Sequence, residues 1–298
     1  MSKEYDLVIL GGGTAGYVSA IRASQLGKKV AIVEKYKIGG TCLHKGCIPT
    51  KSYLKTAEIL RYINHSTEYG IKTASAEFEI MDIVAKKDET VSTMYSGVQS
   101  LMKKYKIDVY EGNGRILGPS LFSPQAGTVS VEYENGESEL LVNNNVLIAT
   151  GSRPIELPFL EFNHHTVISS DDMMHLETLP HNILIIGGGV IGLEFASLLN
   201  DLGVEVTVVE AGPSIIPNEQ QEISKTIKRT FEENGIKIYE KLPLSEDDVL
   251  VQDSHVDVKL QEDNISFDKV LVAVGRTPNT EDLGLNNTKI KTDDKGYI

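Results

Sequence analysis

The segment YDLVILGGGTAG (residues 5–16) joins a short apolar run to a glycine-rich turn. Residues 17–26 have the composition of a helix that Gly27 ends, and residues 29–33 form a second apolar run that closes at Glu34. Strand, glycine turn, helix, strand and acid in this order are typical of a dinucleotide-binding βαβ unit. The sequence therefore predicts one such unit at the N-terminus.

The same arrangement occurs a second time. An apolar run and a glycine turn, NILIIGGGVIG, occupy residues 182–192, a helical segment follows at 193–202, and a strand-like run at 205–209 closes at Glu210. Both the glycine turn and the acid recur after the same interval of 176 residues. We therefore expect an α/β fold with two Rossmann-like dinucleotide-binding domains.

Each glycine of a GxGxxG turn has a separate physical task. The first permits the tight bend, the second lets a pyrophosphate approach the backbone, and the third lets the helix pack on the strand. The phosphate then lies at the positive end of the helix. For a single turn, a merely tight strand-to-helix connection is the alternative, but two complete copies favour cofactor binding. The predicted cofactor-binding glycines are Gly11, Gly13, Gly16, Gly187, Gly189 and Gly192.

The acids that close the two units, Glu34 and Glu210, occupy the position of a ribose acceptor. A carboxylate accepts hydrogen bonds from ribose hydroxyls and repels a 2′-phosphate. Residues 211–224 contain no Lys or Arg that would neutralise such a phosphate. The second unit is therefore predicted to bind NAD rather than NADP.

A chain of 298 residues has the length of two domains. We place the boundary at the TGSRP turn (150–154), with domains at 1–150 and 151–275, and interpret 276–298 as the start of a segment that returns to the first domain. Outside the two units, periodicity predicts further helices and strands. The expected helices are 48–64, 80–105 and 219–234, and the expected strands are 128–133, 140–149 and 270–274.

The net charge of −13 makes nucleic acid and anionic membrane surfaces poor partners. The N-terminus lacks the apolar core of a signal peptide, and no stretch has the length of a membrane span, so we expect a cytoplasmic protein.

The chain has two cysteines, Cys42 and Cys47, in the segment GGTCLHKGCIPTK (39–51). On a regular helix, five residues leave the side chains about 140° apart, so a bridge needs a distorted first turn, which Gly46 permits. Two buried free cysteines are the alternative, and zinc is less favoured because the histidines show no finger spacing. Beside two nucleotide units, a redox disulfide is the better interpretation, and no metal site is predicted.

GGTCLHKGCIPTK, the paired glycine turns, LIATGSRP (147–154) and LVAVGRTPN (271–279) together resemble the flavin-dependent pyridine nucleotide-disulfide oxidoreductases, and within them the dihydrolipoyl dehydrogenase group. The resemblance implies that 1–150 binds FAD and 151–275 binds NAD. It implies that Cys47 faces the flavin and that Cys42 exchanges with a dithiol.

The resemblance also assigns further residues. Lys51 would lie near the flavin and pair with Glu194, whereas ordinary solvated helix positions are the alternative for both. His44 and Lys45 are expected to be exposed spacers. The remaining expected contacts to the cofactors are made by Thr41, Gly114, Thr150 and Gly275.

By this resemblance the chain oxidises dihydrolipoamide with NAD as acceptor. Its partner would be the lipoyl domain of a 2-oxoacid dehydrogenase complex or a glycine-cleavage carrier, and the family forms homodimers. The family's chain normally continues into an interface domain with a His-Glu pair, so we expect a truncated chain that turns over poorly. A catalytically incompetent nucleotide-binding fragment and another NAD-linked disulfide reductase are the alternatives.

Overall fold

The computed structural model describes residues 3–74, 76–118 and 127–298, which form two compact units. Unit 1 consists of Met1–Cys47, Val91–Arg153 and Thr277–Ile298, and unit 2 of Ile48–Thr90 and Pro154–Arg276. The units therefore divide the chain differently from the contiguous segments expected from the sequence. Their assignment to FAD and NAD stays a prediction.

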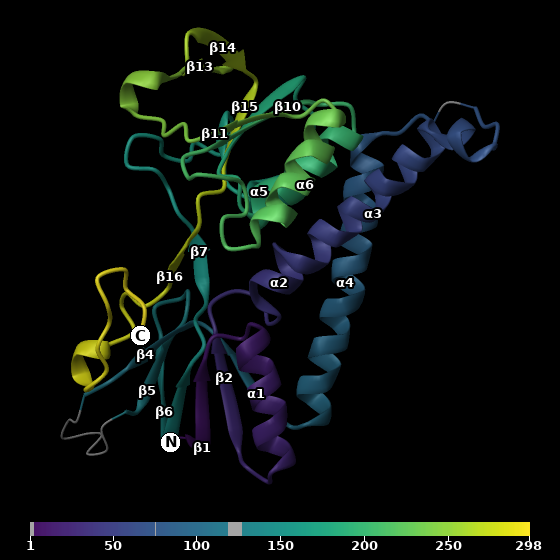
Figure 1. Ribbon diagram of the computed structural model, residues 1–298. Helices are drawn as coiled ribbons and strands as arrows, with labels where there is room; N and C mark the ends of the chain where they lie inside the picture. The colour runs from purple at the N-terminus through teal and green to yellow at the C-terminus, as the bar shows by residue number, and fades with distance from the viewer. Residues whose placement is uncertain (1–2, 75, 119–126) are drawn as a thin grey trace. The chain divides into compact units, whose positions relative to one another are not determined.

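Unit 1 is built on a six-stranded sheet with the order β3-β2-β1-β6-β5-β4. Strands β3, β2, β1 and β6 pair in parallel, whereas the β6–β5 and β5–β4 pairs are antiparallel. The helix α1 (Thr14–Gln25) packs on β1 and β2 (Figure 1). The strands are β1 (Lys3–Leu10), β2 (Val30–Glu34), β3 (Asp108–Glu111), β4 (Asn113–Ile116), β5 (Val129–Glu132) and β6 (Ser138–Ile148).

The smaller elements of unit 1 carry the cysteine segment and the chain connections. A five-residue helix, α2 (Gly40–His44), follows β2. Strands β7 (Ser152–Pro154) and β16 (Arg276–Pro278) pair with each other and contain the residues at which the chain passes from one unit to the other. A 3₁₀ turn, η4 (Leu285–Asn287), lies near the end of the chain.

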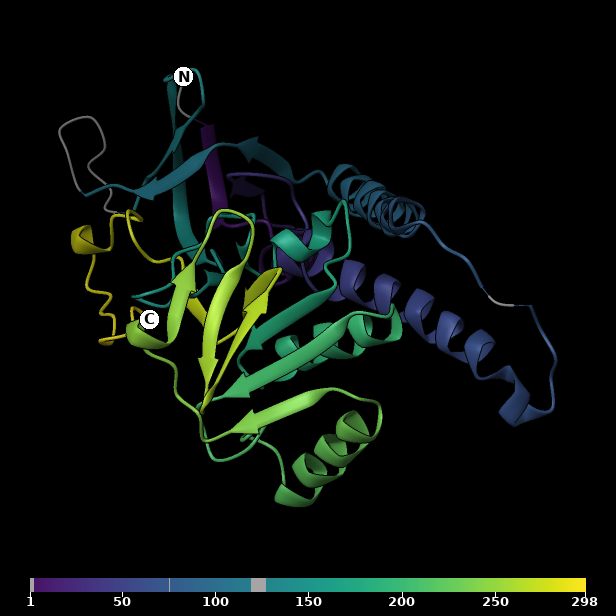
Figure 2. The same ribbon diagram turned by 90° about the horizontal axis from the view of Figure 1, so that it is seen from above.

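Unit 2 contains a five-stranded, wholly parallel sheet with the order β11-β10-β9-β15-β8. Helices α5 (Val190–Asp201) and α6 (Gln221–Glu233) pack on it (Figure 2). The strands are β8 (Val167–Ile168), β9 (Asn182–Ile186), β10 (Glu205–Glu210), β11 (Lys237–Glu240) and β15 (Lys269–Val272).

Further elements of unit 2 complete its two cores. A three-stranded antiparallel sheet contributes apolar side chains to one cluster, and α3 with the first part of α4 contributes to the other. The rest of α4, from Val91, belongs to unit 1. The bounds are α3 (Cys47–Asn64), η1 (Ser66–Tyr69), α4 (Ile80–Lys104), η2 (Asp172–His175), η3 (Glu246–Asp248), β12 (Val249–Val251), β13 (Val256–Leu260) and β14 (Asp263–Phe267).

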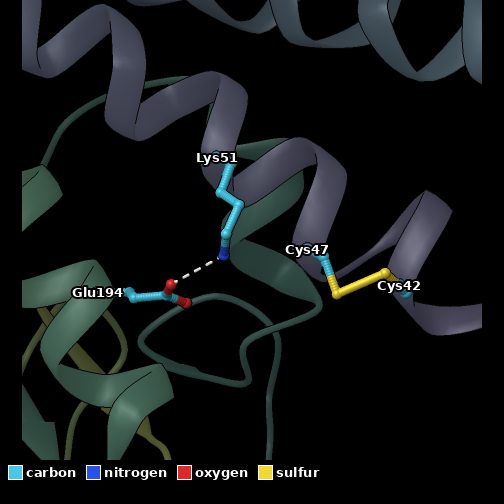
Figure 3. Close-up of a disulfide and its surroundings, with 4 residues drawn as sticks. All are labelled: Cys42, Cys47, Lys51 and Glu194. Atoms are coloured by element: carbon cyan, nitrogen blue, oxygen red, sulfur yellow. Dashed lines mark hydrogen bonds and ion pairs between the residues drawn. A yellow bond between two sulfur atoms is a disulfide. The ribbon is translucent and has the colours of Figure 1, made fainter.

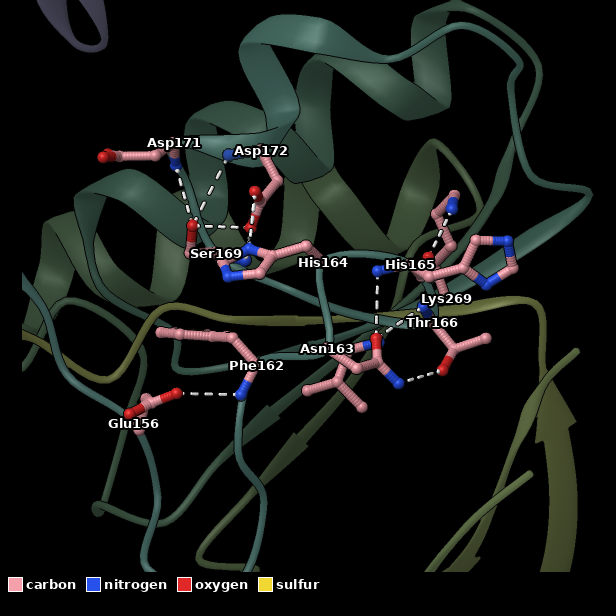
Figure 4. A network of polar contacts seen from close by, with 11 residues as sticks. Glu156, Phe162, Asn163, His164, His165, Thr166, Ser169, Asp171, Asp172 and Lys269 are labelled. Atoms are coloured by element: carbon pink, nitrogen blue, oxygen red, sulfur yellow. Dashed lines mark hydrogen bonds and ion pairs between the residues drawn. The ribbon is translucent and has the colours of Figure 1, made fainter. Parts of the chain in front are cut away.

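The entry into β8 is organised by one side chain, Asn163 (Figure 4). Its Oδ1 accepts hydrogen bonds of 2.9 Å from the backbone N–H groups of His165, Thr166 and Val167. Asparagine forms such local bonds readily, so it replaces backbone partners that the turn lacks. Directly after the turn, Val167 is fully buried on β8, at the edge of the parallel sheet.

The expected α/β architecture and all the expected helices and strands are present, with ends displaced by a few residues. The two helices after the glycine turns were expected to begin at residues 17 and 193, but they begin at Thr14 and Val190. The third glycine of each turn therefore lies inside the first helical turn, where side-chain periodicity gives no signal. Among the described residues, no helix combines the length and apolar character that a membrane span needs.

Candidate redox and dinucleotide sites

Cys42 and Cys47 form a disulfide with a Cα–Cα distance of 4.7 Å (Figure 3). The two cysteines lie on different helices, because α2 ends at His44 and α3 begins at Cys47. The helix is thus broken between them, which confirms that the spacing needs a distorted turn. An added Cβ on Gly46 would lie 3.1 Å from the Thr41 carbonyl oxygen, so the break is tightly packed.

The segment before the disulfide packs on the first glycine turn within unit 1. Gly40 has φ +64°, and an added Cβ there would lie 2.4 Å from the Gly13 Cα. The N–H of Gly39 donates to the Gly12 carbonyl oxygen over 2.8 Å. The redox pair and the first predicted cofactor turn are therefore parts of one packed structure.

The first glycine turn has the stereochemistry expected of its sequence. Gly11 has φ +100°, and an added Cβ would lie 2.2 Å from the Ala149 carbonyl oxygen. An added Cβ on Gly16 would lie 1.9 Å from the Gly11 carbonyl oxygen. The protein itself therefore requires glycine at both positions.

The second glycine turn repeats this geometry in unit 2. Gly187 has φ +111°, and an added Cβ would lie 2.5 Å from the Ala273 carbonyl oxygen. An added Cβ on Gly192 would lie 2.2 Å from the Gly187 carbonyl oxygen. The two predicted units thus agree in backbone conformation as well as in sequence.

The middle glycine of each turn has no such explanation within the protein. Gly13 and Gly189 have φ −68° and −78°, which any residue adopts. Among the described residues, chain neighbours and the helix's own backbone aside, none has an atom within 4 Å of an added Cβ on Gly189, and the Gly40 Cα, at 3.7 Å, is the one atom near an added Cβ on Gly13. Space is therefore kept open beside both helix N-termini, neither of which has a side-chain cap or an acid in its first turn. These features fit the close approach of a pyrophosphate.

The two acids make matching contacts. Glu34 accepts hydrogen bonds from the N–H groups of Gly12 (2.7 Å) and Tyr36 (2.8 Å). Glu210 accepts them from Gly188 (2.8 Å) and Gly212 (2.6 Å). Because a carboxylate has about four acceptor positions, each acid retains capacity for ribose hydroxyls.

The family model described as pyridine nucleotide-disulphide oxidoreductase matches residues 5–298. The chain belongs to this family. Its members, including the dihydrolipoyl dehydrogenases, use FAD and NAD(H), which the glycine turns fit.

Several curated relatives in this family carry the name dihydrolipoyl dehydrogenase. The protein from Bacillus subtilis (strain 168) is 47% identical over 298 residues, covering 98% of this chain and 63% of the relative. The protein from Acholeplasma laidlawii is 38% identical over 306 residues, covering 99% of this chain and 86% of the relative.

Among solved structures, the Cu(II) complex of the HOCl-induced flavoprotein disulfide reductase RclA from Escherichia coli has a TM-score of 0.83 and 25% identity. The match covers 99% of this chain and 62% of that protein. The chain thus spans less than two thirds of the length of the Bacillus relative and of this reductase.

In this member of the family, the expected Lys51–Glu194 pair is formed within unit 2 (Figure 3). The Lys51 Nζ lies 3.2 Å from the Glu194 Oε1, and the Lys51 side chain is 66% exposed. The contact joins α3 to α5 across 143 positions of sequence. Because the pair is exposed, it adds little to stability, and its role in electron transfer stays a prediction.

The other expected cofactor residues have structural partners. The Thr150 hydroxyl donates to the Asn279 carbonyl oxygen (2.6 Å), and the Thr41 carbonyl accepts from the Lys45 N–H (2.8 Å). An added Cβ on Gly114 would lie 2.5 Å from the end of the Leu10 side chain, so Leu10 would have to shift to admit any other residue there. Gly275 has φ +139°. Their cofactor contacts stay predictions.

The sequence interpretation of His44 as an exposed spacer was wrong, because its ring is half-buried and its Nε2 lies 2.9 Å from the Ile38 carbonyl oxygen. The sequence offered no signal for this contact, since Ile38 stands in a turn and His44 at the end of a five-residue helix that side-chain periodicity does not reveal. Lys45 is exposed as expected.

A second histidine contact lies in unit 2, where the His164 Nδ1 is 2.9 Å from the Asp172 Oδ1 (Figure 4). Burial opposes the charge of Asp172, but hydrogen bonds from Ser169 and His164 outweigh it and lower the pKa of that carboxyl. The Asp172 Oδ2 accepts from both the N–H and the hydroxyl of Ser169, at 2.7 Å each. The carboxylate therefore organises the turn into η2.

Proposed function

We propose that this protein oxidises a dihydrolipoyl group and passes the two electrons through the Cys42–Cys47 disulfide and FAD to NAD. The observation that carries the proposal is the packing of the disulfide segment on the first glycine turn, through Gly40 and Gly13. This packing supports the proposal because it brings the disulfide segment against the proposed dinucleotide site in one unit.

The cysteines perform the exchange with substrate. A substrate thiolate attacks the Cys42 Sγ, which forms a mixed disulfide and releases the Cys47 thiolate. The second substrate thiol then attacks the mixed disulfide and releases Cys42, so that the substrate leaves as a cyclic disulfide. Two electrons and two protons remain on the protein.

Bound FAD would take up these two electrons, and bound NAD would receive them as a hydride. Lys51 and Glu194 would fix a positive charge near Cys47, because Lys51 follows Cys47 by one helical turn on α3. The proposed cofactor contacts also include Thr41, Gly114, Thr150 and Gly275.

The choice of NAD over NADP rests on Glu210, whose carboxylate would repel a 2′-phosphate. A lysine outside residues 211–224 contacts the segment after this acid through its backbone. Lys241 donates its backbone N–H to the Gly212 carbonyl oxygen over 3.0 Å, although it lies 31 positions from Glu210 in sequence. NAD remains the proposed acceptor because the carboxylate accepts from Gly188 and Gly212 directly.

The proposed partner is the lipoyl domain of a 2-oxoacid dehydrogenase complex or a glycine-cleavage carrier, in a cytoplasmic homodimer. The dihydrolipoyl substrate follows the names of the relatives, and the partner, the homodimer and the location follow the family resemblance.

An anaerobic titration tests the proposed function. The chain is supplied with FAD, reduced with dihydrolipoamide or with glutathione, and followed by flavin absorbance before NAD or NADP is added. We expect flavin reduction by dihydrolipoamide and formation of NADH, with a much weaker response to glutathione and to NADP.

Cys42→Ser is the matched control, since it removes the exchange sulfur and changes little else. Flavin reduction by dihydrolipoamide at the parent rate in this variant would contradict the proposed route. A parent chain that binds FAD but responds only to glutathione would instead support a different disulfide reductase.

A further inference from the structure

The segment between the cysteines is fastened to the backbone that precedes it. His44 lies at the end of α2, and its Nε2 is 2.9 Å from the Ile38 carbonyl oxygen. Because a carbonyl only accepts, the Nε2 carries the proton of this hydrogen bond. Ile38 is buried, so loss of the donor would leave its carbonyl poorly satisfied.

The backbone that accepts this bond has little freedom of its own. Gly39 has φ +118°, and an added Cβ would lie 2.3 Å from the Leu43 side chain and 3.1 Å from the His44 Nε2. The Gly39 N–H donates to Gly12 in the first glycine turn. Through Ile38 and Gly39, His44 is therefore tied to the proposed FAD turn.

The other side of the ring contacts α4. The centroids of His44 and Tyr95 are 5.3 Å apart, and their planes meet at 67°, in an edge-to-face arrangement. Such ring pairs favour a defined geometry. His44 thus has a hydrogen bond and a ring contact, both within unit 1.

We propose that His44 is a positioning residue that keeps the Cys42 and Cys47 sulfurs together when the disulfide is open, an inference that rests on the proposed redox function. In the oxidised chain, the sulfur bridge itself restrains residues 43–46. In the dithiol, the restraint comes from packing and from the His44–Ile38 hydrogen bond. Loss of that bond therefore frees the dithiol more than the disulfide and makes the bridge easier to reduce.

The test measures a thiol–disulfide equilibrium and needs no cofactor. The 298-residue chain is equilibrated with mixtures of reduced and oxidised dithiothreitol, and its thiols are counted by alkylation. Each conversion moves two electrons and two protons from dithiothreitol, which becomes a cyclic disulfide, to the cysteine pair. The readout is the equilibrium constant.

His44→Phe keeps a ring beside Tyr95 and removes the donor, whereas His44→Gln keeps a donor of similar reach. We expect His44→Phe to shift the equilibrium about 2- to 10-fold toward the dithiol, the range of one hydrogen bond. We expect His44→Gln to stay within about twofold of the parent. His175→Phe, at an exposed position of unit 2, is the matched control.

An unchanged equilibrium in His44→Phe would overturn the proposal, as would equal shifts in the Phe and Gln variants. If His44→Phe fails to fold, His44→Asn replaces it, because its amide is too short to reach Ile38. A parent chain that never forms the bridge in oxidising buffer would instead contradict the proposed function. The two failures are thus distinguishable.

Discussion

The two glycine turns of this protein have the same skeleton and different surroundings. In each, the first and third glycines are required by nearby carbonyl oxygens, and a carboxylate 23 positions after the first glycine accepts two backbone N–H groups. At the middle glycine they diverge. Gly40 packs beside Gly13, whereas in the described part of the chain no residue beyond its neighbours lies within 4 Å of an added Cβ on Gly189.

From these surroundings we infer different residence times for the two proposed nucleotides. A nucleotide on the first turn would lie against the cysteine segment, which favours a cofactor that stays bound. The second turn is uncovered at the same point, which favours a nucleotide that exchanges in each cycle. The difference matches the proposed use of FAD as a resident cofactor and NAD as a co-substrate.

The largest expected effect is on stability and concerns the first glycine of each turn. Gly11→Ala or Gly187→Ala should lower the free energy of unfolding by about 2 to 4 kcal/mol, because the new Cβ meets a carbonyl oxygen at positive φ. Urea unfolding followed by circular dichroism measures the loss. Gly27→Ala is the control, since it has φ +78° but open space, and should cost about 1 kcal/mol. Equal losses in Gly11→Ala and Gly27→Ala would disprove the steric explanation.

The next effect concerns the acid of the second turn. Glu210→Ala should weaken NAD binding about 10- to 100-fold, because a charged acceptor of ribose hydrogen bonds is lost. Calorimetric titration measures the affinity, and thermal unfolding reports on the Gly188 and Gly212 contacts that are lost as well. Lys241→Met should leave NAD affinity unchanged. Tighter binding of NADP than of NAD by the parent would contradict the assignment.

Substitutions at the middle glycines test the difference between the two turns directly. Gly189→Val should weaken NAD binding by about tenfold or more with little change in thermal stability, because the side chain enters space that only a ligand would fill. Gly13→Val should also press on Gly40 and shift the thiol–disulfide equilibrium of the cysteine pair. If Gly189→Val binds NAD normally, the open space has another cause.

The smallest effect lies outside both turns. The Arg153 guanidinium binds Glu281 through two hydrogen bonds of 2.9 and 3.1 Å and lowers the pKa of that carboxyl from 4.5 to about 2. A lowered folded pKa stabilises the protein above pH 4.5, and this contribution disappears as the pH falls toward 2. Both side chains are exposed, so the effect is small.

Unfolding at pH 6 and pH 3 checks this prediction. The stability difference between the parent and Glu281→Gln should be positive at pH 6 and should shrink at pH 3. A difference that does not change with pH would exclude the ionised pair as its source.

Much of the fold follows from local pattern. The alternation of apolar runs, glycine turns and closing acids predicted both βαβ units, because strands, helices and tight turns each have a residue pattern that is visible over a short stretch of sequence. The division into units did not follow, since residues 48–90 cluster with unit 2. That choice depends on which sheet offers an apolar face to α3 and the start of α4, and no local window contains this information.

The candidate site also combines features that the sequence predicted with contacts that it did not predict. The cysteine spacing, the glycines and the two acids were visible as local motifs, and the Lys51–Glu194 pair came from family resemblance rather than from periodicity. The contacts of His44 were not visible, nor was the bond between Thr150 and Asn279, which are 129 positions apart.

Lys87 shows most directly why such contacts could not be predicted from the local sequence. It stands in the charged run AKKDE (85–89), which by itself predicts a solvated helix face, yet the side chain is only 2% exposed. Its Nζ donates to the Met174 carbonyl oxygen over 2.8 Å and to Asp88 over 2.5 Å. A buried ammonium is tolerated only when such acceptors meet it. The sequence by itself determined where the strands, turns and reactive groups stand, whereas only tertiary packing decided which acceptor, 87 positions away, makes a buried lysine possible.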